Sequence, residues 1–399
     1  MMRFKRSGLA RLGLAVVRTV VMAGTLAAAT MCWWTVIPAQ AAQTNARSAP
    51  STPVKVETVV KGLSHPWGLQ FLPDGRMLVT ERDGRLRLAG TDGALSAPVA
   101  GVPEVHARGQ GGLLDVRLAP DFATSAVIYL SYSEPREGWG KSGTTVARAR
   151  LVLANGSGRL DDVKAIFRQE PAQSTSHHYG SRIVPAPDGK LFITTGERGQ
   201  GDLAQDPVAL LGKIIRINPD GSLPDDNPKK PGWAPQIWSI GHRNIQGAAI
   251  DPASGLLWTV EHGARGGDEL NQPQAGRNYG WPVISYGRNY SGSKIGEGTK
   301  KDGMEQPVYY WDPSIATSGL AFYDGALFPG WKGNILVGCL AGARLSRLVI
   351  RGGEVVAEEV LLAERGERIR DVRVGPDGAV YVLIDESDGS ILKLTPAGS

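Results

Sequence analysis

The stretch Pro73-Asp74-Gly75-Arg76-Met77-Leu78-Val79-Thr80 contains the pattern that decides the fold. Asp-Gly after Pro favours a tight turn, and the short apolar run with a β-branched end is typical of a strand. The same turn-and-strand unit recurs, with starts at residues 73, 120, 187, 252, 329 and 376. The intervals of 47, 67, 65, 77 and 47 residues fit one four-stranded blade each, with loops of variable length. The sequence therefore predicts an all-β fold, a six-bladed β-propeller.

The composition agrees with this prediction, because the chain has 52 Gly, 26 Pro and almost no helical periodicity. A pair of β-sandwiches is the alternative fold. A propeller places its long connecting loops around one end of a central channel, so we expect the functional residues there.

The N-terminal part reads as an export signal. Residues 1–41 contain five basic and no acidic residues, an apolar run over 20–37, and then Ala39-Gln40-Ala41. This order predicts a signal peptide cleaved before Ala42, with an uncleaved anchor as the alternative. We therefore expect a periplasmic or secreted protein with no stable membrane insertion after cleavage. Residues 42–58 are rich in Ala, Ser, Thr and Pro and predict a flexible leader, followed by a propeller domain over 59–399.

Removing the signal changes the charge balance. The whole chain has 44 basic and 39 acidic residues, and without the five basic residues of the signal 39 of each remain. A neutral mature chain gives no support for binding of nucleic acid or of anionic membranes. Only Cys339 remains in the mature part, so an intrachain disulfide is excluded there.

A candidate base lies around the third repeat. His177 and His178 precede its turn, and Glu197 follows its strand. Because the chain leaves and returns to the same end of the channel over one strand unit, an imidazole and the carboxylate can meet. A carboxylate that orients a near-neutral imidazole is what a general base needs, although a structural role for the histidines is the alternative.

Two glycine-bounded motifs suggest a site for an anion beside a hard cation. Arg243 and Asn244 lie in Gly-His-Arg-Asn-Ile-Gln-Gly between predicted strands at 236–240 and 248–250. An arginine there offers a fork of donors for carboxylates or for negative charge on oxygen, or else it forms an interblade salt bridge. Asp268 and Glu269, with carbonyls exposed by the Gly-rich run 263–267, make an oxygen-rich setting suited to calcium, or else a solvated acidic loop.

A further arginine group precedes the last repeat. Arg368 and Arg370 occupy alternate positions, which point to one face of a strand. Such a face can grip a polyanionic small molecule, and a solvated strand face is the alternative.

Six segments together match one known family: residues 64–68, 109–115, 211–221, 241–247, 261–271 and 278–282. In them the chain resembles the soluble aldose sugar dehydrogenases that depend on pyrroloquinoline quinone (PQQ), a group that includes soluble glucose dehydrogenases of Gram-negative bacteria. The resemblance covers residues 56–395 and implies a six-bladed propeller.

The resemblance also implies roles for residues of this chain. His178 matches the catalytic base, and Glu197 stands where glucose dehydrogenases have a supporting aspartate. Carbonyls of Gly263 and Ala264 match the holders of the catalytic calcium. The other matched positions are the quinone contacts Arg243 and Asn244, the neighbours of its carboxylates Gln110, Arg368 and Arg370, and a second calcium site at Glu269 and the Tyr279 carbonyl.

This chain departs from the family pattern at two positions. Ala341 stands in the loop where glucose dehydrogenases have a cofactor-binding lysine, and Arg344 is the candidate to reach the same carboxylate. Glu197 is one methylene longer than the matched aspartate, which alters the geometry around the base.

The implied activity is oxidation of C1 of aldose sugars to lactones by hydride transfer to PQQ, with Ca²⁺. Electrons would leave through a soluble or membrane electron acceptor. Two alternatives from other classes are a calcium-dependent propeller lactonase and a non-catalytic propeller that binds a sugar or another ligand.

Overall fold

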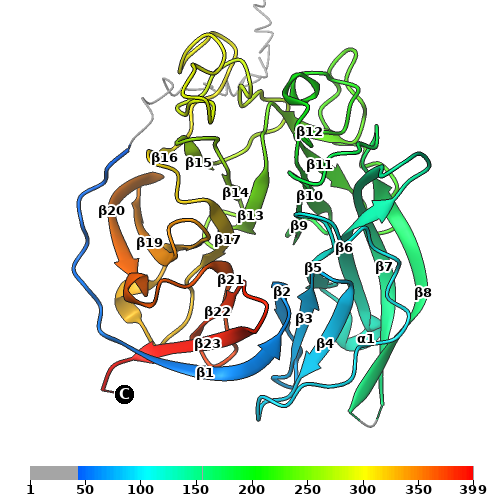
Figure 1. The fold of residues 1–399 in the computed structure, drawn as a ribbon, viewed down its shortest axis with the longest axis vertical. Coiled ribbons are helices and arrows are strands. Elements are labelled where there is room, and N and C mark those ends of the chain that lie inside the picture. Colours follow the sequence, from blue (N-terminus) through cyan, green and yellow to red (C-terminus); the bar gives the residue numbers. More distant parts are fainter. Residues whose placement is uncertain (1–43, 155, 399) are drawn as a thin grey trace, which may run out of the picture. The chain divides into compact units, whose positions relative to one another are not determined.

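The computed structural model describes residues 44–154 and 156–398, so the predicted signal peptide lies outside the described residues. Six antiparallel sheets are arranged around one axis, and the first strand of each sheet is the innermost (Figure 1). Five sheets have four strands and one has three, which confirms the predicted six-bladed β-propeller. Among the described residues, no helix is long and apolar enough to cross a membrane.

The sheets follow one another along the chain. In order, their strands are β2 (Pro66–Phe71), β3 (Met77–Glu81) and β4 (Arg85–Ala89); β5 (Leu113–Leu118), β6 (Val127–Pro135), β7 (Ser142–Ala154) and β8 (Ser157–Arg168); β9 (Gly180–Pro185), β10 (Leu191–Thr195), β11 (Lys213–Ile217) and β12 (Ile237–Ile240); β13 (Ile245–Ile250), β14 (Leu257–Glu261), β15 (Asp268–Asn271) and β16 (Tyr309–Trp311); β17 (Thr317–Phe322), β18 (Ile335–Cys339), β19 (Arg344–Arg351) and β20 (Glu354–Leu361); and β21 (Ile369–Val374), β22 (Val380–Ile384) and β23 (Gly389–Pro396), completed by β1 (Val54–Leu63). The described helices are short: α1 (Phe122–Ser125), η1 (Gly201–Ala204), η2 (Pro329–Trp331) and η3 (Ala363–Arg365).

The repeated sequence unit marks one position in every sheet. Each of the six turns is followed by the second strand, namely β3, β6, β10, β14, β18 and β22. The units at residues 120 and 329 also contain the short helices α1 and η2 before their strands.

Hydroxyl groups connect neighbouring sheets near the axis. Every innermost strand has a bulge or register shift against its neighbour, which frees a backbone N–H from the ladder. In three sheets a second-strand hydroxyl accepts that N–H and donates to a carbonyl of the next sheet, as a hydroxyl can do both at once. The three relays are Gly68 N to Thr80 Oγ1 (2.8 Å) and on to Leu114 O, Asp115 N to Ser131 Oγ (2.8 Å) and on to Ser181 O (2.6 Å), and Arg182 N to Thr194 Oγ1 (2.9 Å) and on to Ile245 O (3.1 Å).

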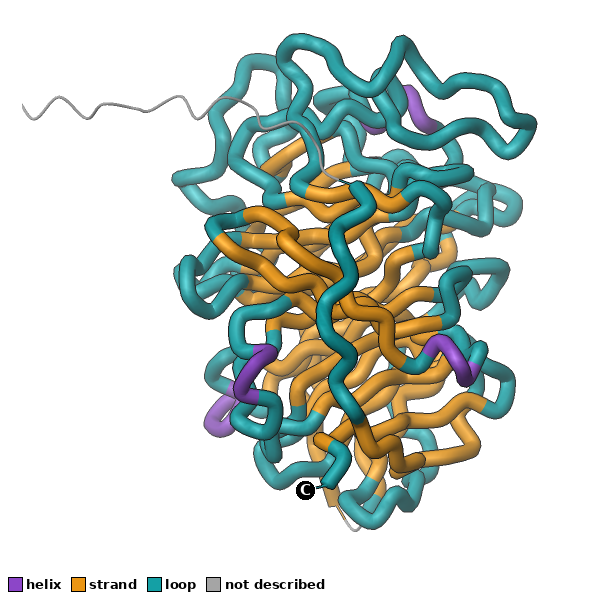
Figure 2. The backbone as a smooth tube through the Cα atoms, turned by 90° about the vertical axis from the view of Figure 1, so that its left-hand side faces the viewer, coloured by secondary structure: helices purple, strands orange, loops and turns teal. Residues whose placement is uncertain are grey.

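The ring is closed by the N-terminal strand, which is the outermost strand of the last sheet. Val54 pairs with Pro396 and Val60 with Ile391, so the two ends of the described chain share one sheet. Ahead of β1, Ser48 bridges Glu358 of the preceding sheet. Figure 2 shows this segment running along the side of the strands. The prediction of a flexible leader over 42–58 is therefore wrong from Val54 onward, because strand pairing supplies the partner that the local composition does not reveal.

We expect Val60→Asp to destabilise the fold strongly. Val60 is buried in an apolar cluster that joins the last sheet to the first. A carboxylate without a partner there should lower the free energy of unfolding by at least about 3 kcal/mol, measured by denaturant unfolding. Val360→Asp in β20 is the matched control, because Val360 is 47% exposed. Equal stability of the two variants would show that closure by β1 is not needed.

Candidate active site

The candidate residues around the third and fourth repeats lie in loops at one end of the propeller. His178 precedes β9, Glu197 follows β10, and Arg243 and Asn244 connect β12 to β13. The loop from His262 to Gly267 connects β14 to β15. Because neighbouring strands run antiparallel, connections from a second to a third strand and from a last to a first strand emerge at the same end.

The predicted imidazole and carboxylate are in contact. His178 Nδ1 lies 2.7 Å from Glu197 Oε1, with side chains 14% and 3% exposed. Burial would raise the pKa of Glu197, but its hydrogen bond with His178 and the charge of Arg243 lower it, so Glu197 is a carboxylate and Nδ1 donates. Burial lowers the pKa of His178, outweighing the opposite effect of Glu197. The arrangement leaves a neutral imidazole with Nε2 as an acceptor.

Gln110 holds the backbone of the same histidine. Its Oε1 accepts a hydrogen bond from His178 N at 2.7 Å, and its own N–H donates to Ser176 O at 2.8 Å. The His178 backbone is in the left-handed region, with φ 56°, so these contacts hold a conformation that a non-glycine residue rarely adopts. Among the described residues, the Nε2 amide of Gln110 has no hydrogen-bond partner, so it can bind another group.

Arg243 and Asn244 are held in place by their neighbours on both sides. Arg243 N donates to Glu261 Oε2 at 2.7 Å, and its guanidinium lies 5.1 Å from the Trp281 ring. Asn244 Oδ1 accepts from Gly180 N at 3.0 Å. Glu197 N donates to Arg243 O at 2.9 Å, which joins the two loops directly.

Several polar atoms of these loops are buried without a hydrogen-bond partner in the described part of the chain. They are Glu197 Oε2, Arg243 Nε, Asn244 Nδ2 and His262 Nε2. Their residues are neighbours, since the charges of Arg243 and His178 act on the pKa of His262, which burial lowers well below its usual value. Buried polar groups are nearly always paired, so the cluster is suited to a polar ligand that supplies the missing partners.

Two carboxylates lie side by side beneath Arg243. Glu261 of β14 and Glu269 of β15 are directly opposite in the ladder, and Asn271 Nδ2 donates to both, at 3.2 Å and 3.1 Å. Burial and then the charge of Glu261 raise the pKa of Glu269 to about 8. A small cavity beside Arg243 is lined by both carboxylates and by Tyr279. Oxygen ligands here fit a hard cation, although the described residues hold no group of three or more His, Cys, Asp or Glu side chains that could bind a metal.

Asp268 does not share this setting. Its carboxylate accepts from Gly263 N (2.8 Å), Ile315 N (2.8 Å) and Ala316 N (2.7 Å), and from the hydroxyl of Ser314. The expectation of an acidic pair facing a cation is therefore wrong for Asp268, because both its oxygens are engaged in joining Gly263 to the 314–316 segment.

The arginines of the last repeat do not share a strand face. Arg368 is exposed and precedes β21, whereas Arg370 is buried at a register shift inside it. The guanidinium of Arg370 forms an ion pair with Asp385 and donates to Gln246 Oε1 at 2.8 Å. The predicted pairing of positions 368 and 370 is wrong because a bulge breaks the alternation of the strand.

Arg344 also has partners elsewhere. It is in β19 and bonds Glu358 of the outermost strand β20 at 3.3 Å, together with Ser346. The expectation that Arg344 replaces the lysine missing at Ala341 is wrong in this conformation, since its guanidinium is directed to the outer edge of the sheet.

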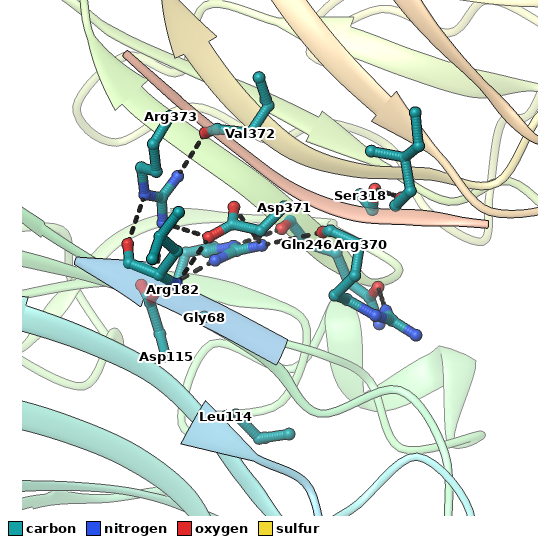
Figure 3. Close-up of polar contacts among 12 residues, drawn as sticks. Gly68, Leu114, Asp115, Arg182, Gln246, Ser318, Arg370, Asp371, Val372 and Arg373 are labelled. Atoms are coloured by element: carbon teal, nitrogen blue, oxygen red, sulfur yellow. Dashed lines mark hydrogen bonds and ion pairs between the residues drawn. The ribbon is translucent and has the colours of Figure 1, made fainter. Parts of the chain in front are cut away.

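An ion network on the axis was missed by the sequence argument. Arg182 lies 3.2 Å from Asp115 and 3.1 Å from Asp371, and Arg373 lies 2.9 Å from Asp371 (Figure 3). Burial would raise the pKa of Asp115, but the surrounding arginines lower it. The available signal was charge inside apolar strands, as in Asp371-Val372-Arg373, but the sequence does not say which charges meet.

Comparisons with known proteins give one consistent result. Residues 63–393 match the family model described as Glucose / Sorbosone dehydrogenase. The chain is 49% identical over 354 residues to aldose sugar dehydrogenase YliI of Escherichia coli, covering 88% of this chain and 94% of that protein. A solved structure of the soluble aldose sugar dehydrogenase of E. coli in the apo-form has TM-score 0.83 and 49% identity, covering 86% and 99% of the two chains. The PQQ-bound aldose sugar dehydrogenase of Streptomyces coelicolor has TM-score 0.73 and 30% identity, covering 87% and 99%.

Glu197→Gln should lower the pKa of His178 further. The carboxylate favours the protonated imidazole, so its loss should shift the titration down by about one unit, measured by NMR of the imidazole. His106 is the internal control, because its lowered pKa arises from burial and from Arg108 and Arg198. An unchanged or raised pKa at His178 would contradict the contact described above.

Proposed function

The chain belongs to the glucose and sorbosone dehydrogenase family of oxidoreductases, and we propose that it is an exported enzyme that oxidises C1 of aldose sugars to lactones with PQQ and calcium. The observation that carries this proposal is the buried His178–Glu197 pair beside unpartnered polar atoms of Arg243, Asn244 and His262. The PQQ named for the S. coelicolor relative supports the choice of cofactor.

His178 is the proposed base. Its Nε2 accepts the proton of the C1 hydroxyl, while Nδ1 donates to Glu197. The carboxylate stabilises the imidazolium that forms and keeps the ring oriented. Because burial lowers the pKa of His178, the imidazole is ready to accept a proton at neutral pH and is protonated only under more acidic conditions. The extra methylene of Glu197 does not prevent the contact.

The residues present fit a polar, anionic cofactor. Among the described residues, Arg243 Nε and Asn244 Nδ2 are buried donors without partners, and exposed Gln110 contacts the backbone of the base. These groups would hold the quinone oxygens and a carboxylate of PQQ, with exposed Arg368 at the rim. PQQ when bound supplies the electron-accepting carbonyl that takes up the hydride. The guanidinium of Arg370 is occupied by Gln246 and Asp385, so Arg370 would support the cofactor site by holding these two side chains and not by direct contact with PQQ.

Calcium would be held by oxygen atoms of the 261–279 region. Carbonyls of Gly263 and Ala264 stand on the loop that Asp268 fixes, and they would hold the catalytic ion. Glu269 and the Tyr279 carbonyl border the small cavity and would hold a second ion. Burial and then the charge of Glu261 raise the pKa of Glu269, and a cation bound beside the two carboxylates would offset their repulsion, which supports this assignment.

Export and electron transfer complete the proposal. The composition of residues 1–41 supports a cleaved signal peptide, and hence a periplasmic or secreted location. Electrons would then pass to a soluble carrier or to a membrane acceptor met by diffusion.

Addition of PQQ and Ca²⁺ to the purified protein should produce aldose-dependent reduction of an artificial electron acceptor. Omission of either component, or chelation of calcium before PQQ is added, should abolish it. The same preparations are tested for hydrolysis of sugar lactones. Lactone hydrolysis without PQQ would favour the lactonase, and PQQ binding without either activity would favour a non-catalytic propeller.

His178→Ala should remove most turnover and leave the absorbance spectrum of bound PQQ largely intact. Loss of a positioned base lowers kcat by about 10²-fold to 10⁴-fold. His106→Ala is the control, since His106 makes no contact with Glu197. Near-normal kcat in His178→Ala would require another base.

A further inference from the structure

The residue after Glu197 is a fully buried arginine. Arg198 has 0% exposed surface, and its backbone is left-handed with φ 60°. Glu197 holds the imidazole of His178, while Arg198 turns to the residues on either side of that histidine. Two adjacent side chains of opposite charge thus grip the same three residues, 177–179.

The contacts of Arg198 are carbonyls, a hydroxyl and a ring. Its Nη1 donates to His177 O at 2.6 Å, and its Nη2 donates to Thr175 O and to Ser142 Oγ, the latter at 3.2 Å. The guanidinium lies 3.5 Å from the centroid of the Tyr179 ring. The Tyr179 hydroxyl forms a hydrogen bond with Ser142 Oγ at 2.8 Å, so Ser142 contacts both Arg198 and Tyr179.

No carboxylate forms an ion pair with Arg198 among the described residues, in contrast to the buried arginines on the axis. Burial lowers the pKa of Arg198. Burying a cation this way is unfavourable unless its donors find partners. Both Nη atoms of Arg198 donate, its Nε has no partner among the described residues, and its planar guanidinium lies over the Tyr179 ring, an arrangement that a lysine does not reproduce. The interaction fixes the segment before His178, which has no regular secondary structure over residues 174–178 apart from bends at 174 and 177.

We propose that Arg198 is a positioning residue that holds the imidazole of His178 against Glu197 through the His177 carbonyl and the Tyr179 ring. This inference rests on the proposed function for its catalytic consequence. Without the fork, the carbonyls of residues 175 and 177 lose their donors and the loop no longer enforces the left-handed backbone at His178. The imidazole then moves into solvent and away from Glu197.

Several charged or titratable groups face His178. Glu197 follows β10, Arg243 lies between β12 and β13, His262 follows β14, and His177 is adjacent in sequence. Burial has the largest effect on the His178 pKa, and it lowers that pKa. Release of the imidazole into water should therefore raise its pKa toward the ordinary value, so that activity is lost at a higher pH as the solution is acidified.

The experiment compares the PQQ- and calcium-loaded wild type with Arg198→Met and Arg198→Lys. Arg198→Met should lower kcat about tenfold or more with KM for the sugar nearly unchanged, because base positioning and not sugar binding is lost. The acid limb of the pH profile should move up by about half a unit to one unit, and the NMR titration of His178 should move with it. Arg198→Lys, which keeps the charge and N–H donors but not the planar fork, should fall between the wild type and Arg198→Met. It is the decisive variant if Arg198→Met does not fold.

Arg216→Met is the matched control. Arg216 is also a buried arginine, 5.1 Å from the Trp238 ring, but it pairs with Asp188 and Asp226 away from the site. The Arg216→Met substitution should lower the unfolding temperature and leave kcat and the acid limb of the pH profile unchanged. If both Arg198 variants lose stability while kcat and the His178 titration stay as in the wild type, the positioning role is refuted. The imidazole titration needs no turnover, so a wild type without sugar oxidation would refute the proposed function and leave this test standing.

Discussion

The arrangement of the site depends on the ion network at the propeller axis. Arg182 joins Asp115 of β5 to Asp371 of β21, and its Nε donates to Gln246 O of β13 at 2.6 Å. Four innermost strands are thus held by one guanidinium, which also lies 4.2 Å from the Trp67 ring of β2. Removing one partner of such a network leaves an unpaired buried charge, which costs about 3–5 kcal/mol. The innermost strands β5, β9, β13 and β21 are therefore fixed relative to one another near the axis.

This network sets the position of the candidate base. Arg182 is in β9, and His178 lies just before that strand. Because β9 is fixed at the axis, the position of the histidine at the end of the propeller is fixed as well. The relay from Ser131 to Ser181 adds a second restraint from the neighbouring sheet. Small residues are needed where the strands approach each other, since a Cβ on Gly319 would lie 2.3 Å from Asp371 Oδ1. The site is positioned by the scaffold beneath it as much as by its own loops.

The sequence predicted those features whose cause is local or repeated. Pro-Asp-Gly turns specify their strands directly, and the spacing of six such units gives the propeller. The contact of His178 with Glu197 followed from one turn-and-strand unit between them, in which β9 leads the chain away from one end of the propeller and β10 leads it back. One prediction failed because the partner is distant: β1 is ordered by β23, more than three hundred residues away. Another failed although the partner is near, because Arg344 bonds Glu358 across the pairing of β19 with β20, which the sequence argument did not resolve. Arg368 and Arg370 were misplaced because a bulge is a property of tertiary packing, and Asp268 because its donors come from the segment before β17.

The site contains several polar atoms that are buried without a hydrogen-bond partner, as do other parts of the described chain. Glu197 Oε2, Arg243 Nε, Asn244 Nδ2 and His262 Nε2 are buried donors or acceptors without partners in the described residues, and each such group costs about 1–3 kcal/mol. Groups fixed in this way need no reorganisation when charge develops beside them, which is how preorganised donors favour a reaction. The same groups would relax into other contacts if the loops were free to move. The axis network, the hydroxyl relays and the closure by β1 prevent that relaxation, so the stability of the ring is what keeps the polar atoms of the site unpaired and available.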